Sequence, residues 1–148
     1  MTRAIGVDFG KKRVGIALSD SLGITAQPLE TVPRPEAVSR IRAIAEEYQV
    51  DHLVVGMPSP LGGGESESSN LAREFGAELE VATGLEVVFV DERFTSRMAE
   101  EALLSSGMKR RDRRSKVDKV AAAIILQTFL DGNFRIAPDV GETGPNDT

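Results

Sequence analysis

Three acidic positions, far apart in the sequence, have side chains that bind hard divalent cations. Asp8 follows the first apolar run of the chain, and Asp91 and Glu92 directly follow a later one. Because side chains alternate along a strand, we expect only one of Asp91 and Glu92 to reach a common site. Asp118 heads a stripe of helical spacing that is otherwise apolar. These acids can converge only if the sheet brings the first and later strands together.

A convergence of this kind would favour metal-dependent hydrolysis. Carboxylates that cluster without a cation repel one another and raise one another's pKa, so a cluster implies a metal. Mg²⁺ prefers oxygen ligands, and two or three carboxylates suffice when a substrate phosphate completes its shell. Two such ions about 3.5 to 4 Å apart would activate a water and stabilise the leaving oxygen of a phosphodiester. The expected cofactor is Mg²⁺ or Mn²⁺.

Each acid also has a purely structural interpretation. Asp8 could cap the turn that follows it, as aspartate often does. Asp91 and Arg93 could form a salt bridge of little energetic worth. Ser115 and Asp118 have the spacing of a capping box at a helix start, a role that is compatible with metal binding.

Positive charge is concentrated in one segment of a chain whose net charge is -5. Cations directly before Asp118 would draw a phosphate backbone toward a metal site, and such binding would weaken as salt rises. A solvated loop is the alternative interpretation. Aromatic residues, at 5%, are too few for a base-stacking platform. The basic residues of this segment are Lys109, Arg110, Arg111, Arg113, Arg114 and Lys116.

The composition excludes several other chemistries. The chain has no cysteine and one histidine, His52, which excludes disulfides, thiol nucleophiles and multi-histidine metal sites. His52 precedes a predicted strand at its amino end, so we expect no catalytic role for it. No apolar run approaches the roughly 20 residues that span a bilayer, and the first residues lack a signal peptide's apolar stretch. We expect a soluble, cytoplasmic protein without a membrane partner.

The apolar patterns predict the elements that must position these groups. Short apolar runs predict strands, and apolar positions three and four residues apart predict helices. The order predicts one α/β domain with a mixed sheet over residues 1–137 and a disordered tail over 138–148. Strands are expected at 4–7, 14–18, 23–31 (ending before Pro33), 53–56 and 85–90, and helices at 35–48, 71–81, 95–104 and 115–130.

Five segments resemble, in the same order, the motifs of the YqgF family, also called RuvX. The resemblance covers the chain from about Ile5 to Leu130. The segments are Ile5-Gly6-Val7-Asp8-Phe9-Gly10; Lys12-Arg13-Val14-Gly15-Ile16-Ala17-Leu18-Ser19-Asp20; Gly56-Met57-Pro58; Val90-Asp91-Glu92-Arg93-Phe94-Thr95-Ser96; and Lys116-Val117-Asp118-Lys119-Val120-Ala121-Ala122.

The resemblance implies a ribonuclease H-like fold, with three antiparallel strands followed by two parallel strands and flanking helices. It also implies a nuclease, described for the family as acting on pre-16S rRNA and formerly as a Holliday junction resolvase. The family's acidic positions fall on Asp8, Glu92 and Asp118, which we expect to be the catalytic, metal-binding residues. Related RuvC-type resolvases carry two acids at helical spacing on the last helix, a pattern that is absent around Asp118.

The expected partner is nucleic acid. We expect precursor rRNA during 5′-end maturation of 16S rRNA, with branched DNA as the alternative and ribosomal precursor particles as a further partner. Lys12, Arg13 and Arg93, together with the basic residues from Lys109 to Lys116, are expected to contact it. The glycine-rich loop at 57–69 could also bring Ser66, Ser68 and Ser69 to phosphates, or serve only as a linker.

Two other classes of function are open. The hairpin that carries Asp8, Gly10 and Gly15 also resembles the phosphate-binding hairpin of actin-like ATPases and sugar kinases. Those enzymes enclose a nucleotide between two such domains, and 148 residues provide one. The second class is a noncatalytic RNA-binding or ribosome-assembly factor, which retention of all three acids argues against.

Overall fold

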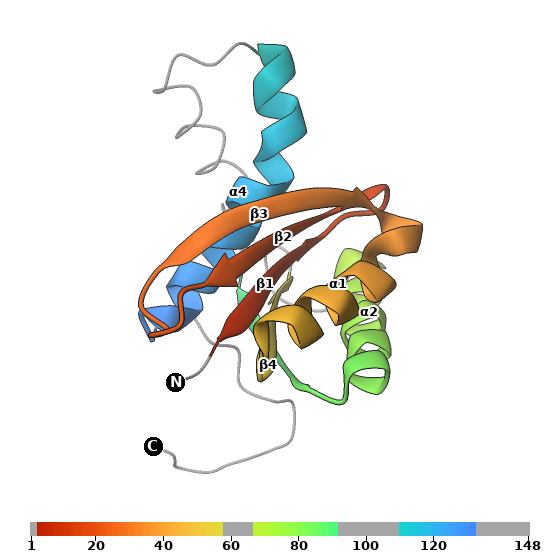
Figure 1. The fold of residues 1–148 in the computed structure, drawn as a ribbon. Coiled ribbons are helices and arrows are strands. Elements are labelled where there is room, and N and C mark those ends of the chain that lie inside the picture. The colour runs from red at the N-terminus through yellow and green to blue at the C-terminus, as the bar shows by residue number, and fades with distance from the viewer. Residues whose placement is uncertain (1–2, 58–66, 92–109, 133–148) are drawn as a thin grey trace.

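The computed structural model describes residues 3–57, 67–91 and 110–132, with the backbone alone for 110–116. Within these ranges five strands form one mixed sheet in the order β3-β2-β1-β4-β5, with helices on both faces (Figure 1). The expected fold class is confirmed. The elements are β1 (Ala4–Phe9), β2 (Arg13–Ser19), β3 (Ala26–Pro33), α1 (Arg34–Tyr48), β4 (His52–Met57), α2 (Glu67–Thr83), β5 (Glu86–Asp91) and α4 (Arg110–Leu130).

The first three strands are antiparallel neighbours, as the apolar runs predict. Asp8 is paired with Gly15 across the β1–β2 hairpin, and Arg13 is paired with Pro33 of β3. The expectation that the third strand ends before Pro33 is therefore wrong. Since β3 lies at the edge of the sheet, a residue without a backbone N–H is tolerated there.

Strand β1 is central, because β4 pairs with it in parallel on the side away from β2. Strand β5 pairs in parallel with β4 and forms the other edge of the sheet. Because β1, β4 and β5 are parallel, their carboxyl ends lie at the same end of the sheet. This arrangement brings the first strand and the later strands together, as convergence of the acids requires.

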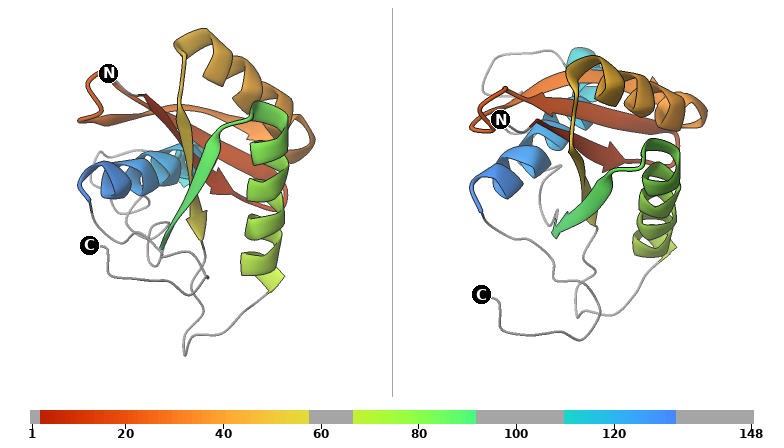
Figure 2. Two further views of the ribbon diagram at one scale, coloured as in Figure 1. Left: turned by 90° about the horizontal axis from the view of Figure 1, so that it is seen from below. Right: turned by 60° about the horizontal axis from the view of Figure 1, so that its bottom comes forward.

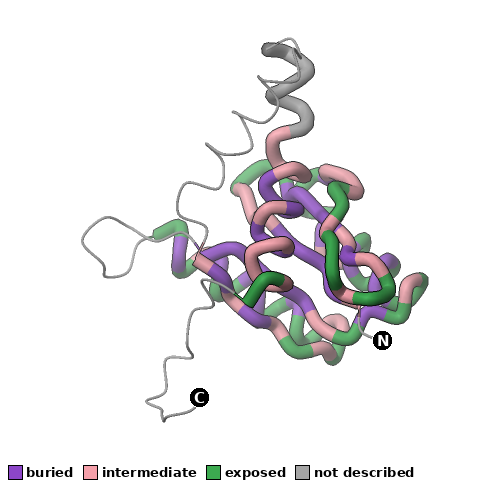
Figure 3. Tube along the Cα trace, turned by 90° about the vertical axis from the view of Figure 1, so that its left-hand side faces the viewer, coloured by how far each residue is buried: buried purple, intermediate pink, exposed green. Residues whose placement is uncertain are grey.

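Two apolar cores cover the two faces of the sheet. Helices α1 and α2 lie on one face and α4 on the other (Figure 2). On the first face Val7 and Ile16 pack with Ile41 of α1 and Leu79 of α2. On the second face Ala4, Ala17, Val54 and Val90 pack with Ala122, Ile125 and Leu126 of α4. The three inner strands, β1, β2 and β4, are buried through most of their length, whereas the edge strands β3 and β5 are only partly buried (Figure 3).

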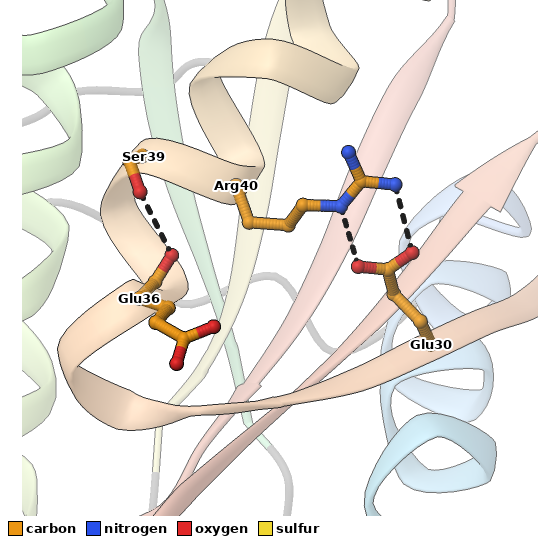
Figure 4. A network of polar contacts seen from close by, with 4 residues as sticks. All are labelled: Glu30, Glu36, Ser39 and Arg40. Carbon is orange, nitrogen blue, oxygen red and sulfur yellow. Dashed lines mark hydrogen bonds and ion pairs between the residues drawn. The ribbon is translucent and has the colours of Figure 1, made fainter.

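A close side-chain contact ties α1 to the edge strand β3. Arg40 donates from Nε and a terminal nitrogen to the two carboxylate oxygens of Glu30, at 2.6 and 2.9 Å (Figure 4). The Ser39 hydroxyl donates to the backbone carbonyl of Glu36 within the first turns of α1. The pKa of Glu30 is held below its usual value, chiefly by the hydrogen bond from Arg40.

Helix α4 begins earlier than expected. Its first residue is Arg110 rather than Ser115, so the basic residues from Arg110 to Lys116 form its first turns. The solvated-loop interpretation is wrong for these positions. The capping-box interpretation is also wrong, because Ser115 and Asp118 lie inside the helix.

Several expectations fall outside the described residues. They include the helix at 95–104, the glycine-rich part of the loop after β4 and the tail at 138–148, which stay predictions. Within the described ranges, no helix combines the length and apolar character that crossing a membrane requires.

Candidate active site

Asp8 lies near the carboxyl end of β1, on the face of the sheet that α4 covers. Its neighbour Val7 belongs to the core under α1 and α2, whereas Ala4 belongs to the core under α4. Alternation along the strand therefore directs Asp8 toward the α4 side. The residue is only partly buried.

Asp118 lies close to Asp8 because helix α4 packs against Gly15, the residue paired with Asp8 across the β1–β2 hairpin. A methyl group on Gly15 would overlap the backbone carbonyl of Asp118, so α4 lies directly on β2 at this position. Because paired residues have Cβ positions about 4.5 to 5.5 Å apart, the Asp118 carbonyl is at most roughly 8 Å from the Asp8 Cβ. Two of the predicted acids thus converge from segments 110 residues apart.

The rest of α4 holds this position through close packing and two hydrogen bonds. A methyl group on Gly6 would lie 2.6 Å from Leu126 Cβ and 2.7 Å from the Ala122 carbonyl oxygen. Farther along, the Gln127 side chain accepts from the backbone N–H of Ala26 and donates to the Ile24 carbonyl, each at 2.9 Å. The absence of a side chain at Gly6 of β1 and at Gly15 of β2 therefore determines the position of Asp118.

Arg13 forms an ion pair with Asp118. Its Nε lies 2.8 Å from Oδ2 of Asp118, with side-chain exposures of 51% and 21%. Such a half-exposed pair contributes only about 0.2 to 1 kcal/mol, so it orients the carboxylate without locking it. Arg13 was predicted to contact nucleic acid directly, and its pairing with an acid of the site is a contact that sequence reasoning missed.

The third acid lies at the end of β5. Val90 packs in the core beside α4, and Phe89 packs against the core on the opposite face. Asp91 therefore points away from the α4 side by alternation, as Phe89 does. Glu92, the residue that the family resemblance selects, lies outside the described residues.

Only some of the predicted nucleic-acid contacts lie within the described residues. Lys12 and Arg13 are exposed at the start of β2. Arg93 and Lys109 lie outside the described residues, as does Ser66. Ser69 is buried inside α2 and is a poor candidate for phosphate contact, whereas Ser68 is exposed. The backbone of Arg110, Arg111, Arg113, Arg114 and Lys116 leads along α4 toward Asp118.

His52 lies at the amino end of β4, away from the acids. Its Nδ1 is 2.7 Å from Oδ1 of Asp51, and its ring meets Phe129 edge-on at 5.2 Å between centroids. That His52 has no catalytic role stays a prediction.

The donor set suits a hard divalent cation, and Asp8 and Asp118 are the described residues that would hold it. Both supply carboxylate oxygens at one end of the sheet, on a strand and a helix whose backbones are fixed by packing. Within the described ranges no cluster of three possible ligands occurs. Two carboxylates would need a third ligand or substrate oxygens to complete a site.

A mixed five-stranded sheet with an acid on its central strand and a second acid on the helix across it defines a ribonuclease H-like domain. RuvC of T. thermophilus, solved with a Holliday junction substrate, has the same fold. The TM-score is 0.54 at 18% identity, over 92% of this chain and 100% of that chain. The family model RuvX, described as a Holliday junction resolvase, matches residues 2–132. The chain belongs to the RuvX family.

Curated relatives match over nearly their whole length. A Lactococcus lactis subsp. cremoris (strain MG1363) protein named "Putative pre-16S rRNA nuclease" is 38% identical over 136 residues, which cover 88% of this chain and 95% of the relative. A relative with the same name occurs in Agathobacter rectalis (strain ATCC 33656 / DSM 3377 / JCM 17463 / KCTC 5835 / VPI 0990). It is 42% identical over 87% of this chain and 94% of the relative. Another, in Geobacillus kaustophilus (strain HTA426), is 41% identical over 87% of this chain and 97% of the relative. The family resemblance seen in the motifs is confirmed.

Proposed function

We propose that this protein is a divalent-metal-dependent nuclease that hydrolyses phosphodiester bonds of precursor 16S rRNA during 5′-end maturation in the cytoplasm. The observation that carries the proposal is the approach of Asp118 to Asp8 across Gly15. The names of the curated relatives support the substrate. Ribosomal precursor particles are the form in which such an RNA would be met.

Asp8, Glu92 and Asp118 would hold Mg²⁺ or Mn²⁺. When bound, the metal supplies an activated water and charge stabilisation for the leaving oxygen. Arg13 orients the Asp118 carboxylate through the contact between Nε and Oδ2.

The cations around the acids would bind the phosphate backbone. Lys12, Arg13 and Arg93, with the basic first turns of α4 and Lys109, provide positive charge in a chain whose net charge is -5. Contacts to phosphates position a strand without reading its sequence. This surface would guide a strand across the acids, and sequence selection would come from the structure of the RNA.

Cleavage of Holliday junctions is the second candidate function. It is favoured by the description of the matching family model as a Holliday junction resolvase. Both candidates use the same acids, and they differ in whether the site accepts RNA or branched DNA.

The deciding experiment compares cleavage of a precursor 16S rRNA fragment and a four-way DNA junction, with Mg²⁺, Mn²⁺ or EDTA. It uses the wild-type protein, Asp8→Asn, and Glu74→Gln as a control that removes an exposed carboxylate from α2. We expect RNA cleavage that requires metal and Asp8 and survives in Glu74→Gln. Cleavage of the DNA junction but not of the RNA would indicate a Holliday junction resolvase instead. RNA binding without cleavage of either substrate would indicate an assembly factor.

A further inference from the structure

A cavity of about 530 Å³ lies on the face of the sheet opposite to Asp118, beside the turn that joins β1 to β2. Its lining combines cations with an apolar floor. The residues around it are Lys11, Lys12, Arg34, Pro35, Phe75 and Glu78.

Backbone and ring contacts bring these side chains together. The N–H of Arg34 donates to the carbonyl of Lys12 at 2.9 Å, so the start of α1 is held against the hairpin turn. The guanidinium of Arg34 stacks over Phe9, with 5.1 Å from its carbon to the ring centroid. Phe9 in turn packs on Phe75 of α2, at 4.6 Å between centroids. The cavity is therefore formed by three elements in fixed relation.

Among the described residues that line this cavity, cations outnumber carboxylates. Within the described ranges none of Lys11, Lys12 and Arg34 forms an ion pair, although other arginines do. Glu78 contributes one carboxylate against these three cations. Three cations held together without ion-pair partners among the described residues repel one another, and an anionic ligand would relieve that repulsion.

We propose that this cavity binds a backbone phosphate of the RNA strand whose cleavage site lies at Asp8 and Asp118, with the sugar against Phe75 and Pro35. The inference rests on the proposed function in taking RNA as the ligand and Asp8 and Asp118 as the place of cleavage. Lys11 is three residues from Asp8, which limits their Cα separation to roughly 11 Å. At about 3.4 Å of rise per nucleotide, this separation corresponds to about three nucleotides of the strand. Its path crosses the hairpin turn from the α4 face to the α1 face.

The test measures binding of labelled RNA oligonucleotides of increasing length in EDTA, where no cleavage occurs. The variants are Lys11→Gln and Arg34→Gln, and the control is Arg42→Gln, an exposed cation farther along α1 whose side chain is 61% exposed. We expect each cavity variant to weaken binding at least about threefold and to reduce the slope of log K against log salt by about 0.7. Arg42→Gln should match the wild type, and thermal unfolding should show that all three variants fold.

Oligonucleotide length provides a second measurement. Wild-type affinity should rise once the strand is long enough to reach the cavity, and the rise should shrink in Lys11→Gln and Arg34→Gln. Equal binding and equal salt slopes in the cavity variants and Arg42→Gln would overturn the proposal. Saturation of the cavity by inorganic phosphate, seen in the amide signals of Lys11 and Lys12 while RNA affinity is unchanged, would reassign it to a free anion and also overturn it.

The outcome separates this inference from the proposed function. Weaker RNA binding by the cavity variants, with no cleavage by the wild type, would support the cavity and contradict the nuclease. Cleavage by the wild type, with binding unaffected in Lys11→Gln and Arg34→Gln, would support the nuclease and contradict the binding of RNA in the cavity.

Discussion

Arg13 and Asp118 are joined by a 2.8 Å contact between Nε and Oδ2, although 105 positions separate them in the chain. The contact connects the start of β2 to an inner turn of α4. It follows from the close approach of α4 to Gly15, because Arg13 and Gly15 lie on the same face of β2. An acid proposed to bind metal is therefore oriented by a cation of the hairpin that carries Asp8.

The coupling between Arg13 and Asp118 should be small and sensitive to salt. We expect a double-mutant cycle with Arg13→Gln and Asp118→Asn to give about 0.2 to 1 kcal/mol in the free energy of unfolding, because the arginine is half exposed. Urea unfolding at low and high salt measures it. A coupling above about 2 kcal/mol that does not change with salt would contradict this account.

Removing Arg13 should affect catalysis more than stability. Without the contact, Asp118 samples other rotamers, so we expect cleavage by Arg13→Gln to fall while its unfolding free energy changes by less than about 1 kcal/mol. Arg40→Gln breaks an ion pair between α1 and β3, away from the acids, and serves as the control. Equal cleavage by the two variants would argue against a positioning role for Arg13.

Gly15→Ala should displace Asp118. The added methyl group overlaps the Asp118 carbonyl, and overpacking of this kind typically costs about 1 to 3 kcal/mol. We expect lower stability by urea unfolding together with loss of cleavage. Gly6→Ala is the matched variant, because its methyl group meets Ala122 and Leu126 farther along α4. If Gly6→Ala lost as much cleavage at equal destabilisation, the loss would reflect α4 packing in general.

Metal binding should depend on Asp8 and Asp118 independently of turnover. A cation that binds the folded state stabilises it by about 2.7 kcal/mol at 100 times its Kd. We expect Mn²⁺ to raise the Tm of the wild type, and to raise it much less in Asp8→Asn and Asp118→Asn. Glu74→Gln should retain the full shift. An identical shift in all four proteins would place the metal elsewhere.

The contact between Glu30 and Arg40 should make part of the stability depend on pH. The pKa of Glu30 is lowered in the folded protein, mainly by its hydrogen bond from Arg40. The pair therefore stabilises the fold above the usual glutamate pKa of 4.5, and this stabilisation is lost as pH falls through the lower folded-state pKa. Because the side chains of Arg40 and Glu30 are partly exposed, at 43% and 29% respectively, we expect this stabilisation to be about 1 kcal/mol or less.

The measurement for this pair is the unfolding free energy of wild type and Glu30→Gln from neutral pH down to about pH 3. The difference between them should be constant near neutrality and shrink below 4.5. Glu46→Gln, in a longer and more exposed pair of 3.5 Å with Arg42, should change stability less. A difference that grows as pH falls would contradict the assigned direction.

The sequence by itself determined the order and type of the described strands and helices, and it selected Asp8 and Asp118 as candidate acids. Apolar runs and helical spacing are local properties, and burial on both faces of β4 follows directly from its unbroken apolar run. Asp8 and Asp118 could be selected because the first ends an apolar strand, the second heads an apolar helix stripe, and both match the acidic positions of the RuvX family. The start of α4 was misplaced, because charged residues carry no apolar periodicity to mark a helix.

Only the tertiary structure decided which of these elements contact one another. The contact of Arg13 with Asp118 and the cavity of Lys11 and Arg34 join segments whose sequence separation hides their proximity. The glycines of β1 and β2 show the physical reason. Gly6 and Gly15 look locally like weak points in strands, yet their missing side chains let α4 lie directly on the sheet and set the position of Asp118.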